Sequence, residues 1–413
     1  MIKREILLIF IAHIALLLLP ITSYSGGPVH GAKAAAMGNA FVGVADDPSA
    51  MAYNPAGITQ LEGTNIYGGV TAVIPSTTYT SPTGEEEKTD FQVFYPPNLY
   101  ATSDFGMKDI SIGLGIFSPF GIGGRKWSKD GLTRYVSTES MIATLWINPT
   151  VAYQVTQTLS IGAGIEYMYA RNEAKRMINQ SALGAGDGEL DLNATGNGWG
   201  YDLGILFKPS EKISLGFAYR SRVKVSYSGT AHFTNIAPAA QPLFGGASFD
   251  TPIHTDSTFP DILSFGAAYR PSGRVTFAFD LEEVRWSSFK NIDIELENQV
   301  PAAGFTNSST PLDWRNVLTI KFGAEYLLSD RFALRGGYAY VPTPVPGQTL
   351  SPSNPDSNQN NVSIGFGYRR EKMVIDFFYM AGFYERRTVT NTILSGSYDN
   401  FVHYTGVSLG YRF

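Results

Sequence analysis

One stretch of the chain carries basic residues at every second position: Arg220, Arg222 and Lys224. In a β-strand this spacing puts all three side chains on one face. The arginine guanidinium is a planar fork of N–H donors that fits a carboxylate, so such a face would bind an acidic group in an enclosed space. Charged residues of matching phase occur in other stretches, namely Glu166, Arg176, Asp280, Glu282 and Arg315. The alternative is that these cations pair with neighbouring acids and only fill the interior.

Residues that would support catalysis or metal binding are sparse. None of the five histidines has the spacing of metal ligands, and the chain holds no G-x-S-x-G elbow and no nucleotide-binding motif. The sequence therefore predicts no enzyme and no metal or cofactor. The net charge of −5 is weak and spread along the chain, which gives no reason to expect nucleic acid as a partner.

The elements that must position these side chains are strands, because the pattern from Thr64 onward has a period of two. In the stretch from Leu159, apolar and aromatic residues such as Ile161 and Tyr167 alternate with Gly162 and Glu166. An aromatic-rich face opposite a glycine-rich face is typical of a barrel whose outside meets lipid. We count fourteen such segments, near 64–80, 97–105, 109–119, 142–156, 159–178, 190–208, 213–233, 259–270, 274–296, 314–328, 332–343, 361–370, 373–390 and 400–413.

The connections alternate between short and long, as between the periplasmic turns and external loops of outer-membrane barrels. Tight turns such as 209–212 and 271–273 are followed by long connections such as 120–141, 234–258 and 344–360. The fold class expected is an all-β, 14-stranded antiparallel transmembrane β-barrel. An even number of strands places both ends of the barrel in the periplasm.

The first residues have the layout of a secretory signal peptide, with Lys3 and Arg4 before an apolar run over 6–19 and small residues near Ser25. That run is shorter than the roughly 20 residues of a membrane-spanning helix. We therefore expect a signal peptide over 1–25, and the chain contains no cysteine for disulfides after export.

Residues 26–63 lack the alternation and are rich in Gly and Ala, which suits a segment packed closely inside the barrel. We expect them to form a hatch that plugs the lumen of a barrel spanning 64–413. Asp47-Pro48 looks like a helix cap followed by a first-turn proline. Asn54-Pro55-Ala56 looks like the stop of that helix.

The sequence resembles the FadL family of outer-membrane transporters over essentially the whole mature chain. The family's hatch motif matches Gly38, Phe41, Gly43, Ala45, Asp46 and Asp47, followed by Asn54, Pro55 and Ala56. Weaker strand motifs match Asn148-Pro149, Trp199-Gly200-Tyr201, Tyr219-Arg220-Ser221, Trp286-Ser287-Ser288-Phe289 and the closing Gly410-Tyr411-Arg412-Phe413. The resemblance implies a fourteen-stranded barrel with an N-terminal hatch. By local motif, Arg176 and Arg315 match positions where family members carry basic residues near a bound fatty acid.

An apolar ligand also needs an apolar pocket, and the phase of each strand selects Trp146, Leu206, Phe378 and Met380 as lumenal candidates. Phe244 lies among Ile236, Leu243 and Phe249 in a long external stretch that would either capture a greasy ligand or pack on itself. In the family, the Asn-Pro-Ala stretch lies beside a kinked third strand and helps hold an opening in the wall. Here the third segment carries Gly113, Gly115 and Pro119, residues that bend or weaken a β-ladder.

The resemblance implies a passive outer-membrane channel for long-chain fatty acids or aromatic hydrocarbons. Ligand would be captured at external loops, held in an apolar lumenal pocket, and released past a mobile hatch sideways through the wall. The partners expected are the ligand, outer-membrane lipids and the barrel insertion machinery, which would read the terminal Phe413; we expect a monomer. A general porin for polar solutes and a structural or adhesin-like barrel are the alternatives.

Overall fold

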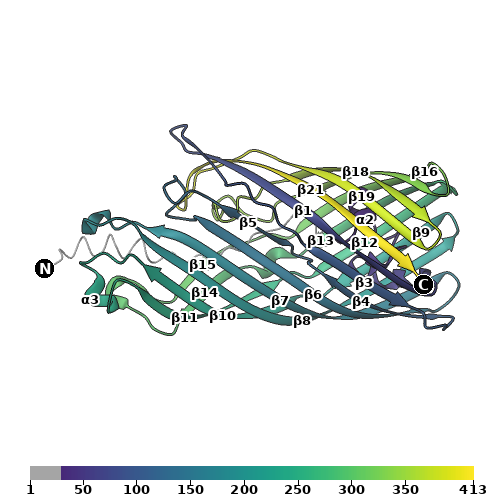
Figure 1. The fold of residues 1–413 in the computed structure, drawn as a ribbon, viewed down its shortest axis with the longest axis horizontal. Helices are drawn as coiled ribbons and strands as arrows, with labels where there is room; N and C mark the ends of the chain where they lie inside the picture. The colour runs from purple at the N-terminus through teal and green to yellow at the C-terminus, as the bar shows by residue number, and fades with distance from the viewer. Residues whose placement is uncertain (1–28) are drawn as a thin grey trace.

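The computed structural model describes residues 29–413, so the predicted signal peptide lies outside the described range. One continuous sheet runs obliquely around the long axis of the molecule (Figure 1). Its strands are β1 (Thr64–Thr80), β2 (Glu86–Lys88), β3 (Pro97–Ser103), β4 (Ile110–Phe117), β5 (Ile122–Lys126), β6 (Glu139–Gln154), β7 (Leu159–Ile178), β8 (Gly188–Ser210), β9 (Ile213–Arg220), β10 (Val223–Thr234), β11 (Phe249–Phe259), β12 (Ile262–Ser272), β13 (Val275–Val284), β14 (Asn291–Leu296), β15 (Ser308–Pro311), β16 (Val317–Leu327), β17 (Phe332–Val341), β18 (Gln359–Arg370), β19 (Met373–Tyr384), β20 (Arg387–Val389) and β21 (Gly396–Arg412).

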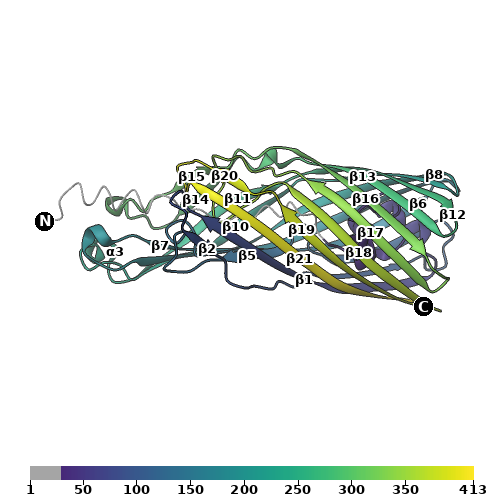
Figure 2. The ribbon, with the colours of Figure 1, turned by 90° about the horizontal axis from the view of Figure 1, so that it is seen from above.

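The sheet closes into a barrel because β21 pairs with β1 along nearly its whole length, from Asn65↔Arg412 to Thr80↔Ser397. Several wall strands are interrupted and carry two labels, as β4 and β5 do, and the closed barrel has 14 antiparallel strands. The predicted fold class is confirmed. The turns at the C-terminal end are short, whereas the opposite end carries the long loops and the helix α3 (Gln241–Phe244), as Figure 2 shows. Among the described residues, no helix is long and apolar enough to cross a bilayer.

The predicted alternation is present on the uninterrupted strands. On β7, Ile165 is 59% exposed on the outer face, whereas the neighbouring Glu166 is fully buried on the inner face. Two of the predicted long connections are wrong in part, because 120–141 contains β5 and the first residues of β6, and 234–258 contains the start of β11. Strand β11 begins at Phe249 and pairs with β10, and the external end of β10 also pairs with β8.

The prediction that Arg222 and Lys224 face the lumen together with Arg220 is wrong. Six residue steps separate Arg220 from Ser226, whereas five separate their partners Asp202 and Asn197 on β8. The extra residue is a β-bulge, and a bulge turns every later side chain to the other face. Arg222 and Lys224 are therefore exposed, and they pair with Asp261 (2.7 Å) and Asp256 (2.6 Å).

A second break at Pro260-Asp261 lies beside the first, because Arg220 pairs with Ile262 and Val223 pairs with Phe259. On the external side of the two breaks apolar residues face the lumen, and Val223, Val225, Ile253 and Phe259 are buried. On the periplasmic side the inner face carries polar residues such as Arg220 and Ser264. The paired breaks thus bring apolar side chains of β10 and β11 into the external half of the lumen, where they lie beside buried polar residues such as Thr251 and Arg176.

Residues 29–63, which we call the hatch segment, lie inside the periplasmic half of the barrel (Figure 2). They form α2 (Ala32–Ala36) and two 3₁₀ helices, η1 (Pro48–Ala52) and η2 (Pro55–Gln60). Asp47 caps η1 by accepting a hydrogen bond from the Ser49 amide (2.8 Å), as predicted. Asn54, expected to stop a helix, follows η1 but caps a second helix, because its Oδ1 accepts from the Ala56 amide (3.2 Å).

The wall beneath the hatch segment presents glycines on its inner face. A Cβ added at Gly323 would lie 2.6 Å from the Met37 carbonyl oxygen, and one at Gly162 would lie 2.5 Å from the Ala56 amide nitrogen. Only a residue without a side chain permits so close an approach of two backbones. The same contact with the hatch segment recurs on neighbouring strands, at Gly204, Gly216, Gly266, Gly337 and Gly365.

Candidate functional site

The external half of the lumen contains a continuous run of aromatic rings. Trp314 contacts Trp286 (ring centroids 5.1 Å apart), and Trp286 contacts Phe120 (5.8 Å). Phe120 then contacts Trp146 (5.9 Å), and Trp146 contacts Phe117 (6.0 Å). We call these five rings the aromatic column; each is at most 4% exposed.

The aromatic column continues into the hatch segment. The Phe117 ring lies 5.0 Å from the ring of His30, which contacts Tyr53 (5.5 Å), and Tyr53 contacts Phe41 (5.4 Å). Rings from the external half thus connect without interruption to the hatch segment. Phe259 and Phe289 pack on its side, 4.7 Å from Phe120 and 5.3 Å from Trp286 respectively. A chain of apolar rings is an environment into which hydrophobic molecules partition from water.

Arg220 lies where the aromatic column meets the hatch segment. Its guanidinium stands over the Trp146 ring (4.9 Å to the centroid) and the Phe117 ring (5.5 Å). Its Nε donates to Glu166 (2.7 Å), and the same group donates to the carbonyl oxygens of Ala52 (3.0 Å) and Met51 (3.4 Å). One buried cation therefore joins the apolar lumen, a wall carboxylate and η1.

Other wall side chains hold the hatch segment at separate points. The Asp280 carboxylate accepts hydrogen bonds from the amides of Phe41 (2.7 Å) and Val42 (2.9 Å). The Asn54 amide group donates to the carbonyl oxygens of Val42 and Ile205, both at 3.0 Å. These contacts satisfy polar backbone groups that would be costly to bury unpaired.

A small cavity of about 40 Å³ lies between the hatch segment and the wall, and its lining includes His30, Tyr53, Arg220, Ser264 and Lys321. Burial lowers the pKa of His30, and Arg220 and Lys321 act in the same direction, so the imidazole is neutral at pH 7. Neither ring nitrogen has a hydrogen-bond partner among the described residues. The space would hold a few waters and no larger molecule.

The predicted lumenal residues are distributed over several parts of the barrel. Trp146 lies in the aromatic column, whereas Leu206 is buried on β8 and Phe378 packs against α2. Arg176 is buried on the external part of β7. Arg315 is exposed between β15 and β16, where its amide donates to Pro344. The structure thus does not gather the predicted basic residues into one group.

Phe244 lies in an external cluster, not in the lumen. Its ring contacts those of Phe233 and Phe249 at 5.4 Å each and that of Phe305 at 6.2 Å. These rings belong to α3, to the ends of β10 and β11, and to the loop after β14. Of the two open interpretations of this stretch, packing of loop residues on one another describes the structure.

The residues predicted to form an opening in the wall differ in what they contact: some lie against the hatch segment and others against neighbouring wall residues. A Cβ at Gly113 would collide with Met51 of η1, and one at Gly115 would meet Phe117 and Tyr100 at 3.2 Å. Asn54-Pro55-Ala56 packs instead against β7 and β8, at Gly162 and Gly204. Pro119 lies in the break between β4 and β5, next to Phe120 of the aromatic column.

Sequence reasoning missed most of the aromatic column. Trp286 and Trp314 lie outside regular strands, where the alternation of side chains cannot tell which residues face inward. Phe120 occupies the break after β4. The signal present was local, because Phe120, Trp286 and Trp314 stand where the alternation stops. Among the described residues no group of three potential metal ligands is formed.

The comparisons with known proteins agree with this architecture. The chain is 24% identical to the long-chain fatty acid transport protein of Escherichia coli K12 over 81% of this chain and 82% of that protein. A Pseudomonas aeruginosa FadL homologue superposes with a TM-score of 0.82 at 18% identity, covering 96% of this chain and 99% of that one. The Pseudomonas putida toluene transporter TodX gives 0.76 at 19% identity, covering 93% and 98%.

A family model described as outer membrane protein transport protein (OMPP1/FadL/TodX) matches residues 21–413. Members of this family are transport channels of the outer membrane, not enzymes. The chain belongs to the OMPP1/FadL/TodX family, the outer-membrane transporters of hydrophobic substrates.

Proposed function

We propose that this barrel is a passive channel for long-chain fatty acids or aromatic hydrocarbons. The observation that carries the proposal is the unbroken run of rings from Trp314 through Trp146 to Tyr53. Ligand enters among the external loops and displaces column side chains, which lie in contact with one another. The names of the relatives, a fatty acid transporter and a toluene transporter, support the same two ligand classes.

Passage requires the hatch segment to move, because the cavity beneath the aromatic column holds only about 40 Å³. Arg220 couples the ligand to this movement. A carboxylate that reaches the foot of the column competes with the Ala52 and Met51 carbonyls for the same N–H donors. A hydrocarbon lacks this competitor and acts only by displacing the rings of Phe117 and Trp146. Arg176 would contact the carboxylate earlier, because it is buried in the external half of the lumen.

Release occurs sideways through the wall at the break between β4 and β5. The ladder of β3 with β4 ends at Leu99↔Ile116, and β5 resumes the wall by pairing with β6. The neighbouring strand is also irregular there, with a single bridge from Phe94 to Val73 between β2 and β3. Phe120 brings the aromatic column to this break. A sideways exit leads an apolar ligand into hydrocarbon without crossing water.

Planar-bilayer recording together with ligand binding tests this function. Addition of oleate or toluene should quench or shift the fluorescence of the protein, while ion conductance stays near that of the bare bilayer. Cis-parinaric acid supplied from the loop side should then fluoresce from the membrane before it reaches the opposite compartment. A large steady conductance with no ligand binding would instead identify a general porin.

A further inference from the structure

At the foot of the aromatic column, one cation is shared by two buried acids. The Arg220 guanidinium lies 2.7 Å from Glu166 and 3.7 Å from Asp202, whose side chains are 0% and 2% exposed. One oxygen of each carboxyl group, Glu166 Oε2 and Asp202 Oδ2, has no hydrogen-bond partner among the described residues. The single positive charge of Arg220 therefore cannot neutralise both acids.

A second group of charges beside the same cavity has the same imbalance. The Lys321 ammonium pairs with Glu282 at 2.9 Å, and both side chains line the cavity together with Arg220. Asp280 is the direct cross-strand partner of Lys321 and is 1% exposed. The neutral His30 adds no positive charge. The two groups together hold four carboxyl groups and two cations.

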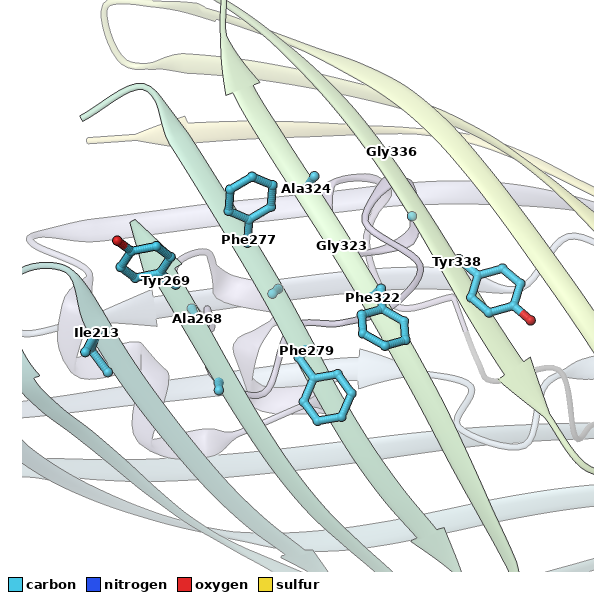
Figure 3. A pocket seen from close by; sticks show the side chains of 13 residues that line it. Ile213, Ala268, Tyr269, Phe277, Phe279, Phe322, Gly323, Ala324, Gly336 and Tyr338 are labelled. Carbon is cyan, nitrogen blue, oxygen red and sulfur yellow. The ribbon is translucent and has the colours of Figure 1, made fainter. Parts of the chain in front are cut away.

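The surroundings of the second group are apolar on the outside and closed on the inside. Figure 3 shows the outer face of β13 and β16, where Phe279 and Phe322 occupy the positions next to Asp280 and Lys321. The two rings contact each other, with centroids 5.0 Å apart. On the lumenal side the hatch segment covers Asp280, which accepts a hydrogen bond from the Val42 amide (2.9 Å). Charges enclosed in this way interact strongly, because little water screens them.

Two further basic residues of the barrel interior do not restore the balance. Lys33 of the hatch segment pairs with Asp46 at 2.7 Å. Arg176 stands ten residues beyond Glu166 on β7, which is about 33 Å along the strand. A ligand carboxylate at the foot of the column would therefore add a negative charge that neither residue neutralises, unless the ligand carries its own proton.

We infer that the foot of the aromatic column passes uncharged molecules and excludes fatty-acid anions, so that hydrocarbons are the preferred class of ligand. Burial of an anion without a cation is costly, whereas an aromatic hydrocarbon needs only apolar rings, which the column supplies. A fatty acid passes this point as the protonated acid. The inference rests on the proposed function and narrows its two ligand classes to one.

Photo-crosslinking with two matched probes tests this selectivity on the full-length barrel in detergent at a mildly alkaline pH. One probe is stearic acid with a diazirine near its carboxyl group, and the other is the methyl ester of the same molecule. Crosslinks within residues 48–53 or 117–120, located by mass spectrometry, report arrival at the foot of the column. We expect the ester to label these residues at least about tenfold more than the acid at equal concentration.

The outcomes separate this inference from the function on which it rests. Labelling of the foot by the acid that equals or exceeds labelling by the ester would overturn the inference and leave the proposed function standing. Labelling of the foot by neither probe would contradict the proposed function itself.

Two variants each remove one negative charge with little change in size, Asp202→Asn and Glu282→Gln. Each should raise labelling by the acid severalfold relative to the ester, because one cation becomes available to a new partner. Glu283→Gln is the control, since Glu283 pairs with Arg285 on the outer surface and should leave the ratio unchanged. The ratio of acid to ester corrects for any loosening of the hatch segment, and heat-modifiable migration on a gel verifies folding. An unchanged ratio in both folded variants of the foot would overturn the inference.

Discussion

The Arg220 guanidinium on the wall donates a hydrogen bond to the carbonyl oxygen of Ala52 in the hatch segment, over 3.0 Å. The same group pairs with Glu166 and stands over the ring of Trp146. Arg220 thus contacts the aromatic column, the wall and the hatch segment at once. Arg220 is therefore the point at which occupancy of the lumen would be sensed by the hatch segment.

Replacement of this residue, Arg220→Gln, should loosen the hatch segment. Glu166 is fully buried and would lose its cation, which typically costs about 3–5 kcal/mol for a buried pair. Hydrogen exchange at residues 48–53 should accelerate strongly. Arg222→Gln is the matched control, because its side chain is 53% exposed on the outer surface and pairs there with Asp261. Similar exchange in both variants would show that Arg220 does not hold η1.

Two adjacent glycines on β17 test how closely the hatch segment fits. Gly337→Ala should displace it, because the new methyl group collides with the Gly38 backbone, and overpacking of this kind costs about 1–3 kcal/mol. In Gly336→Ala the new methyl group faces the lipid, so this variant should leave the hatch segment in place. Ion conductance of the two variants gives the comparison: a rise for Gly337→Ala alone is expected, and equal conductance would argue against a tight fit.

Removal of a column ring, Trp286→Ala, should weaken binding of oleate and of toluene by about tenfold, since both ligands use the same rings. Trp199→Ala serves as control, because Trp199 is 65% exposed on the outer wall whereas Trp286 is 3% exposed. Titration calorimetry in detergent measures both. If Trp199→Ala weakened binding as much as Trp286→Ala, the ligand would not lie in the aromatic column.

The hatch segment should also respond to pH through Asp47. Burial raises the pKa of Asp47 from 3.8 to about 6, although Lys33 opposes the shift. Since the packed state prefers the protonated acid, its stability falls as pH rises from about 4 through 6, and Asp47→Asn removes this loss. The difference in hydrogen-exchange protection between Asp47→Asn and the native protein should therefore grow over this window, to at most about 3 kcal/mol. A difference independent of pH would contradict it.

Much of the barrel could be predicted because lipid imposes a strict alternation on strands that face it. Ile161, Ile165 and Tyr169 on β7 lie outside as their parity indicates. The external half could not be predicted in the same way. One inserted residue near Ser221 reverses the phase, and neither Ser221 nor Arg222 is a residue type that marks a bulge.

The candidate site was predicted only in part, for the same reason. Trp146 follows from parity because β6 is regular, whereas Phe120 and Trp286 occupy breaks in their strands. The prediction that the basic residues face the lumen rests only on the alternation of side chains along each strand. Arg220 is there, but its donors are engaged by Glu166 and the hatch segment, and such pairing depends on contacts between residues far apart in sequence.

The most direct test of the central claim, that ligand passes only when the hatch segment moves, is a reversible lock. The Thr59 and Ser160 hydroxyl oxygens of η2 and β7 lie 2.8 Å apart, and the chain has no cysteine, so Thr59→Cys/Ser160→Cys would join hatch and wall by a disulfide. Thr64→Cys/Ser103→Cys is the matched control, because those hydroxyls are also 2.8 Å apart but both belong to the wall. Uptake of oleate into vesicles should stop when the first pair is oxidised, recover on reduction, and continue throughout in the control. Undiminished uptake through the oxidised Thr59→Cys/Ser160→Cys barrel would contradict the account.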